Sequence, residues 1–279
     1  MITKMKYRGF HVCYKNNDTR YLEILDDILS CNVKRLSVQM VFKSLPHTHV
    51  SLLNTPYGQF VLKIYSPRKK RIEKFFKSFF TPNPNENLIE RIDYAGRQGH
   101  TFPNDFYLLA ERRIFRFAKI SLMLFEYVPG PELRVLPAIT PDIKREIRHS
   151  MQKMHNLKII SGDAHGGNFI LSEKGIRIID LSGKRCNAKR IVEDNVTASL
   201  RIGIPIESHR RWEKRLIAKK SDDTIKSSRG SIWRVQIPLK PFIHAGQQPV
   251  IKEFSLVYGI FANPLPCSLH LTVSRGGFS

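Results

Sequence analysis

The chain has 279 residues, enough for one two-lobed domain or two small ones. Lysine and arginine outnumber aspartate and glutamate by 46 to 24, and the formal net charge is +22 at pH 7. This charge predicts an acidic partner: anionic lipid, phosphorylated glycan or nucleic acid. The four cysteines include no Cys-x-x-Cys pair, which disfavours a disulfide framework or a zinc site. The apolar run 120–128 is too short to span a bilayer and no secretory signal opens the chain, so we expect a soluble or peripheral protein.

Three segments near the N-terminus are predicted to be strands of a small β-rich lobe. They cover residues 34–42, 50–53 and 59–65, and the turn Asn54–Gly58 joins the last two. Lys63 lies in a Val-Leu-Lys-Ile context, which is typical of the strand lysine that neutralises ATP phosphates in kinases. A solvated lysine on an alternating strand is the alternative, and it is favoured unless later motifs complete a nucleotide site. The turn between the first two strands contains no glycine, so the usual glycine-rich phosphate lid is absent.

The segment 68–80 combines aromatic and basic residues at helical spacing. Its large apolar residues share one face, and they are Ile72, Phe75, Phe76, Phe79 and Phe80. Its basic residues on the other sides include Lys70, Arg71, Lys74 and Lys77. The pattern indicates either an interface with anionic lipid or a helix whose aromatic face packs on the small lobe while its lysines are solvated. For the aromatic residues we favour packing.

The next helical segment, 86–93, carries Glu86 and Glu90 on one face. The strand lysine of a kinase needs a carboxylate from a following helix to hold it, so we assign Glu86 to Lys63. Glu90 is the alternative partner, and either residue also fits an ordinary surface charge.

A buried strand over 122–128 ends at a Pro-Gly pair. In a kinase this position is the hinge, so the backbone groups of Glu126 and Val128 are candidates for binding adenine. A strand that simply ends at Pro-Gly is the alternative. Further along, Thr140–Asp142 has the sequence of a helix start, and the apolar stripe that follows predicts core packing.

The most informative stretch is 161–168, Ser-Gly-Asp-Ala-His-Gly-Gly-Asn. Asp163 and Asn168 have the spacing of a kinase catalytic loop, and Asp180 follows an apolar run in Asp-Leu-Ser-Gly, where kinases have Asp-Phe-Gly. Two alternating segments around a Ser-Glu-Lys-Gly turn predict a hairpin that brings Asn168 and Asp180 to one end. Asp163 would then orient the attacking hydroxyl while Asn168 and Asp180 hold Mg²⁺ on ATP phosphates. A Gly/Asp-rich surface turn is the alternative, which the second aspartate makes the weaker one.

Beyond these motifs, the chain resembles the bacterial lipopolysaccharide core heptose(II) kinases over about residues 1–191. The segments that carry the resemblance are Met1–Lys4, Tyr7–Phe10, Asn54–Gly58, Lys74–Phe79, Asn104–Arg112 and Ile178–Cys186. The resemblance implies a two-lobed, protein-kinase-like α+β fold with a β-rich N-lobe and a helical C-lobe. It implies an ATP- and Mg²⁺-dependent phosphotransferase that acts on the lipopolysaccharide inner core at the cytoplasmic face of the inner membrane.

Such an acceptor is an anionic glycolipid. We therefore predict contact with an anionic membrane surface through Lys70, Arg71, Lys74 and Lys77. No nucleic-acid partner is expected, because no nucleic-acid-binding motif is recognisable. The alternatives are a kinase-fold phosphotransferase that acts on another small molecule or a protein, and an inactive basic kinase-like module. The intact set of kinase residues argues against an inactive protein.

We divide the chain into an N-lobe over 1–128, the catalytic part of the C-lobe over 129–192 and an atypical tail over 193–279. The tail shows no clear periodicity, no resemblance to the family and several prolines that exclude long helices. Our hypothesis is a frameshifted or extended reading frame that is poorly ordered, and short added strands are the alternative. If the family's own tail supplies core helices, its loss would leave an enzyme that is unstable or inactive.

Overall fold

The computed structural model describes residues 1–67 and 71–204. Lys70 and most of the predicted tail, residues 205–279, therefore lie outside the described residues, as does the side chain of Arg71. Within the described part of the chain, no helix is both long enough and apolar enough to cross a bilayer.

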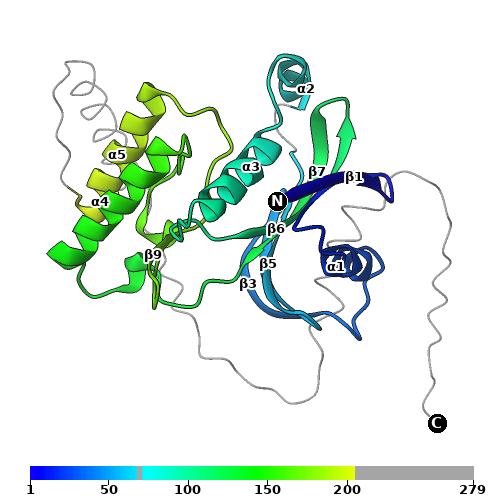
Figure 1. The fold of residues 1–279 in the computed structure, drawn as a ribbon, viewed down its shortest axis with the longest axis horizontal. Coiled ribbons are helices and arrows are strands. Elements are labelled where there is room, and N and C mark those ends of the chain that lie inside the picture. The colour runs from blue at the N-terminus through cyan, green and yellow to red at the C-terminus, as the bar shows by residue number, and fades with distance from the viewer. Residues whose placement is uncertain (68–70, 205–279) are drawn as a thin grey trace, which may run out of the picture. The chain divides into compact units, whose positions relative to one another are not determined.

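A seven-stranded antiparallel sheet forms the N-terminal lobe (Figure 1). Its strand order is β1-β2-β6-β7-β5-β4-β3. The strands are β1 (Ile2–Tyr7), β2 (Phe10–Lys15), β3 (Ser37–Leu45), β4 (Thr48–Thr55), β5 (Gly58–Tyr65), β6 (Phe106–Ile114) and β7 (Phe117–Glu126). The predicted strands correspond to β3, β4, β5 and β7. β1, β2 and β6, which extend the sheet beyond β7, are not among the predicted strands.

Five helices are described: α1 (Arg20–Leu29), α2 (Arg71–Phe80), α3 (Pro84–Arg97), α4 (Pro141–Asn156) and α5 (Ala188–Ile202). The start of α4 is as predicted, because the Thr140 hydroxyl accepts a hydrogen bond from the Ile143 N–H. α3 begins earlier than predicted, because the Asn83 side chain accepts from the N–H groups of Asn85 and Glu86. The Asn-Pro pair at its start is a capping signal that the sequence analysis overlooked.

The C-terminal lobe contains α4, α5 and a hairpin of β8 (Phe169–Ser172) and β9 (Gly175–Ile178). The 3₁₀ turns η1 (Leu133–Val135) and η2 (Gly166–Asn168) precede this hairpin. The predicted α+β class, with a strand-rich N-lobe followed by a helical C-lobe, is confirmed. α5 continues across residue 192, where the sequence analysis placed the start of the tail.

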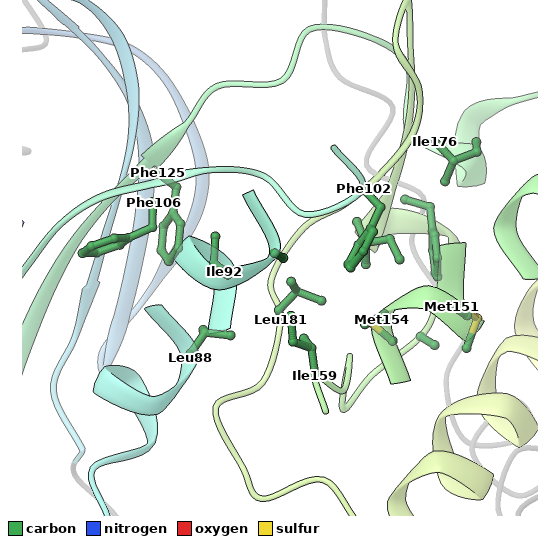
Figure 2. Close-up of a cluster of buried hydrophobic side chains, with 14 of the residues drawn as sticks. Leu88, Ile92, Phe102, Phe106, Phe125, Met151, Met154, Ile159, Ile176 and Leu181 are labelled. Carbon is green, nitrogen blue, oxygen red and sulfur yellow. The ribbon is translucent and has the colours of Figure 1, made fainter. Parts of the chain in front are cut away.

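One hydrophobic core runs through both lobes (Figure 2). Leu88 and Ile92 of α3 lie between the sheet residue Phe125 and the C-lobe residues, which include Met151 and Met154 of α4. The apolar stripe of α4 is thus core packing, as predicted. α3 therefore couples the sheet to the lobe that carries the hairpin.

Phe169, the first residue of β8, is fully buried in this core. We expect Phe169→Ala to lower the free energy of unfolding by about 3–5 kcal/mol, because it removes a large apolar side chain and leaves a cavity. The matched control is Phe80→Ala in α2, where Phe80 is 88% exposed and the change should stay within about 0.5 kcal/mol. Urea unfolding measures both, and equal losses would contradict the continuous core.

Candidate active site

The β8–β9 hairpin places Asn168 beside the residue that precedes Asp180. Phe169 pairs with Ile178, and the Ile179 N–H donates to the Asn168 carbonyl at 2.9 Å. The Asn168 side-chain amide in turn donates to the Asp163 carbonyl at 2.8 Å. The predicted hairpin therefore forms, and it brings the three polar residues of the kinase motif into one region.

Asp163 points its carboxylate to the surface, and its side chain is 70% exposed. His165 Nε2 lies 3.6 Å from the carboxylate oxygen Oδ2 of Asp163. His165 Nδ1 accepts a hydrogen bond from the Gly167 N–H at 3.0 Å, so in the neutral ring the proton is on Nε2, toward Asp163. The loop thus fixes the His165 ring next to an accessible carboxylate.

A buried carboxylate that was not predicted from the sequence binds the backbone of this loop. Asp194 of α5 has a side chain only 3% exposed, and its oxygens accept from the N–H groups of Ser161 and Gly162 at 2.7 and 2.8 Å. Its Oδ2 is also 3.3 Å from His155 Nε2 at the end of α4. Asp194 lies beyond residue 192, in sequence that we had assigned to the tail, and no local motif marks it.

Two glycines allow the loop and the Asp-Leu-Ser-Gly segment to pack closely. Gly162 has φ +81°, and a Cβ there would lie 2.9 Å from the Ser182 Cβ. A Cβ on Gly183 would lie 1.6 Å from the Pro84 carbonyl oxygen at the start of α3. Asn87 of α3 also donates its side-chain amide to the Gly183 carbonyl at 2.9 Å. The segment after Asp180 is therefore held between the loop 161–168 and α3.

Lys63 of β5 forms an ion pair with Asp180, across the two lobes. Asp180 has φ 54°, a conformation that is uncommon for residues with a side chain and that aspartate tolerates better than most. Its carboxylate is 51% exposed, so its position follows from the backbone and from Lys63 rather than from burial. Lys63 and Asp180 are thus a second pair of predicted site residues that the structure joins directly, besides Asn168 and Asp163.

The carboxylate predicted to hold Lys63 lies elsewhere in this structure. Glu86 pairs with Arg113 of β6 at 2.8 Å, and Arg113 also pairs with the fully buried Glu111 at 2.6 Å. Burial acts to lower the pKa of Arg113, but the two carboxylates outweigh it and raise that pKa above its ordinary value. The alternative residue, Glu90, pairs with Lys4 of β1. A Lys63–Glu86 pair therefore stays a prediction.

The predicted hinge has a structural link that the sequence analysis did not anticipate. The Glu126 carboxylate binds Arg177 of β9 and also accepts from the Asp105 N–H at 2.9 Å. The Glu126 N–H donates to the Asp105 carbonyl at 2.9 Å, and Val128 is buried. The side chain of Glu126 therefore ties the last sheet strand to the C-lobe hairpin, while adenine binding by the backbone of Glu126 and Val128 stays a prediction.

The donor set around Asp180 fits a magnesium ion. The Asn168 side-chain nitrogen donates its hydrogen bond to the Asp163 carbonyl. The side-chain oxygen of Asn168 is therefore the atom that could bind a cation. Mg²⁺ prefers oxygen ligands and is usually held by one or two protein groups together with phosphates and water. The described residues contain no group of three or more His, Cys, Asp or Glu side chains that could hold a metal by themselves.

Comparisons with known proteins place the chain in a family. Residues 1–221 match the model of the family described as "Lipopolysaccharide core biosynthesis protein (WaaY)". The chain belongs to the WaaY family. The match continues past residue 191, where the resemblance visible in the sequence ended, so the hypothesis of unrelated sequence stays a prediction only after residue 221.

Two curated members of the WaaY family, both called lipopolysaccharide core heptose(II) kinase WaaY, align over 207 residues. One, from Escherichia coli, is 48% identical over 74% of this chain and 89% of its own length. The other, from Escherichia coli strain K12, is 40% identical over 74% of this chain and 88% of its own. Among solved structures, a point mutant of the PknI kinase domain of Mycobacterium tuberculosis matches with a TM-score of 0.38 and 16% identity, over 59% of this chain and 70% of that one.

Gly162 offers a test of the close packing at the loop. Gly162→Ala should weaken both the fold and any phosphoryl transfer, because a Cβ is strained at positive φ and also displaces Ser182. Gly99→Ala is the matched control, since Gly99 has φ +76° but no atom within 4 Å of a Cβ. Thermal unfolding and turnover of both variants measure the difference, and equal effects would mean that the contact with Ser182 does not matter.

Proposed function

We propose that this protein is an ATP-dependent kinase that phosphorylates heptose II of the lipopolysaccharide inner core. The observation that carries the proposal is the meeting of Asp163, Asn168 and the Lys63–Asp180 pair at one hairpin end. Membership of the WaaY family, with relatives that are named heptose(II) kinases, supports the choice of acceptor. The reaction class follows from the site and the substrate follows from the relatives.

Asp163 is the group proposed to receive the acceptor. Its exposed carboxylate accepts the hydrogen bond of a sugar hydroxyl, orients that oxygen toward the terminal phosphate and takes the proton late in the transfer. His165, with its Nε2–H directed at the same carboxylate, limits the rotation of the Asp163 side chain. Asp194 fixes the backbone of the loop and acts through Asp163 as a positioning residue.

Nucleotide binding is assigned to both lobes. A bound magnesium ion neutralises the phosphates and orients them for transfer. The Asn168 amide oxygen and the Asp180 carboxylate are the groups that would hold it, and Lys63 contributes a further positive charge to the phosphates. In the present structure Lys63 is bound to Asp180, so ATP has to draw the ammonium group onto its phosphates when it binds.

The acceptor is attached to a membrane, so we propose that the enzyme works as a peripheral protein at the cytoplasmic face of the inner membrane. The predicted contact residues are Lys70, Arg71, Lys74 and Lys77. Lys77 forms an ion pair with Glu73 within α2. The Lys74 ammonium lies over the ring of Tyr65 in β5, so Lys74 links the helix to the sheet of the N-lobe. Positive charge next to an anionic surface contributes about 1 kcal/mol per residue.

Replacement of the proposed base separates its role from ATP binding. We expect Asp163→Ala to lower kcat by about 10²–10⁴-fold while KM for ATP changes little, because the carboxylate meets the hydroxyl and not the nucleotide. Asp142→Ala is the control, since this carboxylate is 84% exposed at the start of α4. Steady-state kinetics with lipopolysaccharide that lacks the phosphate give both constants. A loss that lies wholly in ATP binding would assign Asp163 another role.

The basic residues are tested by removal of charge. Replacement of Lys70, Arg71, Lys74 and Lys77 by glutamine should raise KM for intact lipopolysaccharide and weaken binding to anionic vesicles, with little change in KM for ATP. The matched control replaces four exposed lysines on other parts of the described chain, namely Lys6, Lys34, Lys153 and Lys174. An equal loss in both sets would show only a general effect of net charge. An equal loss for ATP and lipopolysaccharide would make α2 structural.

A further inference from the structure

Five large apolar side chains form an exposed aromatic patch at one end of the N-lobe. Their exposed fractions are 75% for Ile72, 61% for Phe76, 42% for Phe79, 88% for Phe80 and 72% for Phe115. The first four belong to α2, and Phe115 belongs to the turn between β6 and β7. Figure 1 shows α2 at the top of the view, beside the tip of the hairpin that β7 forms with β6. Two elements that are far apart in the sequence therefore contribute to one surface.

Ring contacts join the two elements. The ring centroids of Phe79 and Phe115 are 5.5 Å apart, and Phe75 lies 6.3 Å from Phe115 and 6.2 Å from Phe117. Phe75 is half-buried and Phe117 is buried, so these two rings attach α2 to the sheet. The expectation that the aromatic face of this helix packs on the N-lobe thus holds for Phe75 and in part for Phe79, which contacts Phe115 but is still 42% exposed, while Ile72, Phe76 and Phe80 remain exposed.

The backbone at Phe115 makes its position unusual. β6 ends at Ile114 and β7 begins at Phe117, and these residues pair, so Phe115 and Arg116 form a two-residue turn. Phe115 has φ 53°, a conformation that such turns normally give to glycine, asparagine or aspartate. A bulky ring at this position is costly for the backbone, and its contacts with Phe75 and Phe79 still leave it 72% exposed. Neither the turn nor the core accounts for a phenylalanine here.

The surroundings of the patch indicate which partner covers it. Lys74 and Lys77 are exposed on the other sides of α2, where Lys77 pairs with Glu73, the one acidic residue of this helix. Arg116 and Lys119 are exposed on the β6–β7 hairpin. Exposed aromatic rings with a basic rim fit the boundary between headgroups and acyl chains of an anionic bilayer. A second copy of this chain would bring two basic rims together, which repulsion opposes.

We propose that the aromatic patch inserts into an anionic bilayer, with α2 lying in the interface and Phe115 as a second anchor. The inference rests on the proposed membrane-bound acceptor and adds a hydrophobic attachment to the electrostatic one. Two anchors on different elements fix the orientation of the N-lobe relative to the bilayer, whereas charge alone draws the protein to the surface without orienting it. The orientation of the active site relative to the bilayer would then also be fixed.

A tryptophan at the turn reports insertion directly. Phe115→Trp should show a blue-shifted emission and quenching by brominated acyl chains with vesicles that contain phosphatidylglycerol, and neither change with pure phosphatidylcholine. The unsubstituted chain, with its own Trp212 and Trp233, supplies the background. A tryptophan emission that neither shifts nor is quenched when anionic vesicles are added overturns the proposal. Protection of the tryptophan from a soluble quencher before lipid is added also overturns it, because protein then covers the patch.

A second variant separates membrane binding from folding. Glycine suits the turn better than phenylalanine, so the melting temperature of Phe115→Gly should stay the same or rise. Its partition coefficient onto anionic vesicles should fall about tenfold, which corresponds to the lower end of the free-energy range for burial of one phenylalanine side chain. Val33→Ser removes an apolar side chain that is 52% exposed on another part of the chain and should leave partitioning unchanged. Unchanged partitioning of Phe115→Gly, or an equal loss for Val33→Ser, contradicts the proposal.

The outcome is independent of the proposed function, because vesicle binding requires neither ATP nor transfer. If the protein has no kinase activity but still inserts into anionic vesicles, the proposed function is refuted and the proposed insertion of the aromatic patch is supported. If the patch and the function are both correct, Phe115→Gly should keep its kcat on a deacylated, water-soluble core oligosaccharide and lose activity on lipopolysaccharide in vesicles. An equal loss on both acceptors would mean that Phe115 acts on the fold or the active site, and would overturn insertion.

Discussion

A buried carboxylate is costly unless its oxygens are hydrogen-bonded, and the position of Asp194 follows from that constraint. Its side chain is only 3% exposed, and it accepts hydrogen bonds from the N–H groups of Ser161 and Gly162, in the loop that precedes Asp163, and contacts His155. Removal of the carboxylate would leave two backbone donors without partners, at about 1–3 kcal/mol each. The loop that presents Asp163 is therefore tied to α5, and α5 must be folded for the site to exist.

The same region is fixed from the N-lobe by contacts that leave little freedom. Gly183 lies against the Pro84 carbonyl with no room for a Cβ, and the Asn87 side chain donates a hydrogen bond to the Gly183 carbonyl. The position of the segment after Asp180 therefore depends on the position of α3. Glu126, at the end of β7, binds Arg177 of β9. A shift of α3 relative to the C-lobe would thus move the Asp180 carboxylate. The Lys63–Asp180 pair joins two elements that have other contacts to position them, because β5 is paired within the sheet and β8 is paired with β9.

The parts of the site that the sequence predicted are those set by local chemistry. Spacing around a tight turn was enough to place Asn168 beside Asp180, because a hairpin register depends only on neighbouring residues. Asp194 and the Arg113 partner of Glu86 could not be found in this way, because both pairings join segments that are distant in sequence and have no motif. Likewise, β1 was missed because its burial pattern shows little of the alternation that marks a strand.

The proposed acceptor explains why so polar a site stands open. The carboxylates of Asp163 and Asp180 are 70% and 51% exposed, and water weakens the field of such groups. Only Lys184–Asn187 separate Gly183 from the start of α5, a link too short to fold over the site. The acceptor that we propose, a bulky glycolipid held at a bilayer, would cover these two carboxylates and exclude water from them more completely than a small sugar would. The exposure of these carboxylates and the proposed attachment to a bilayer are therefore both consistent with one kind of acceptor.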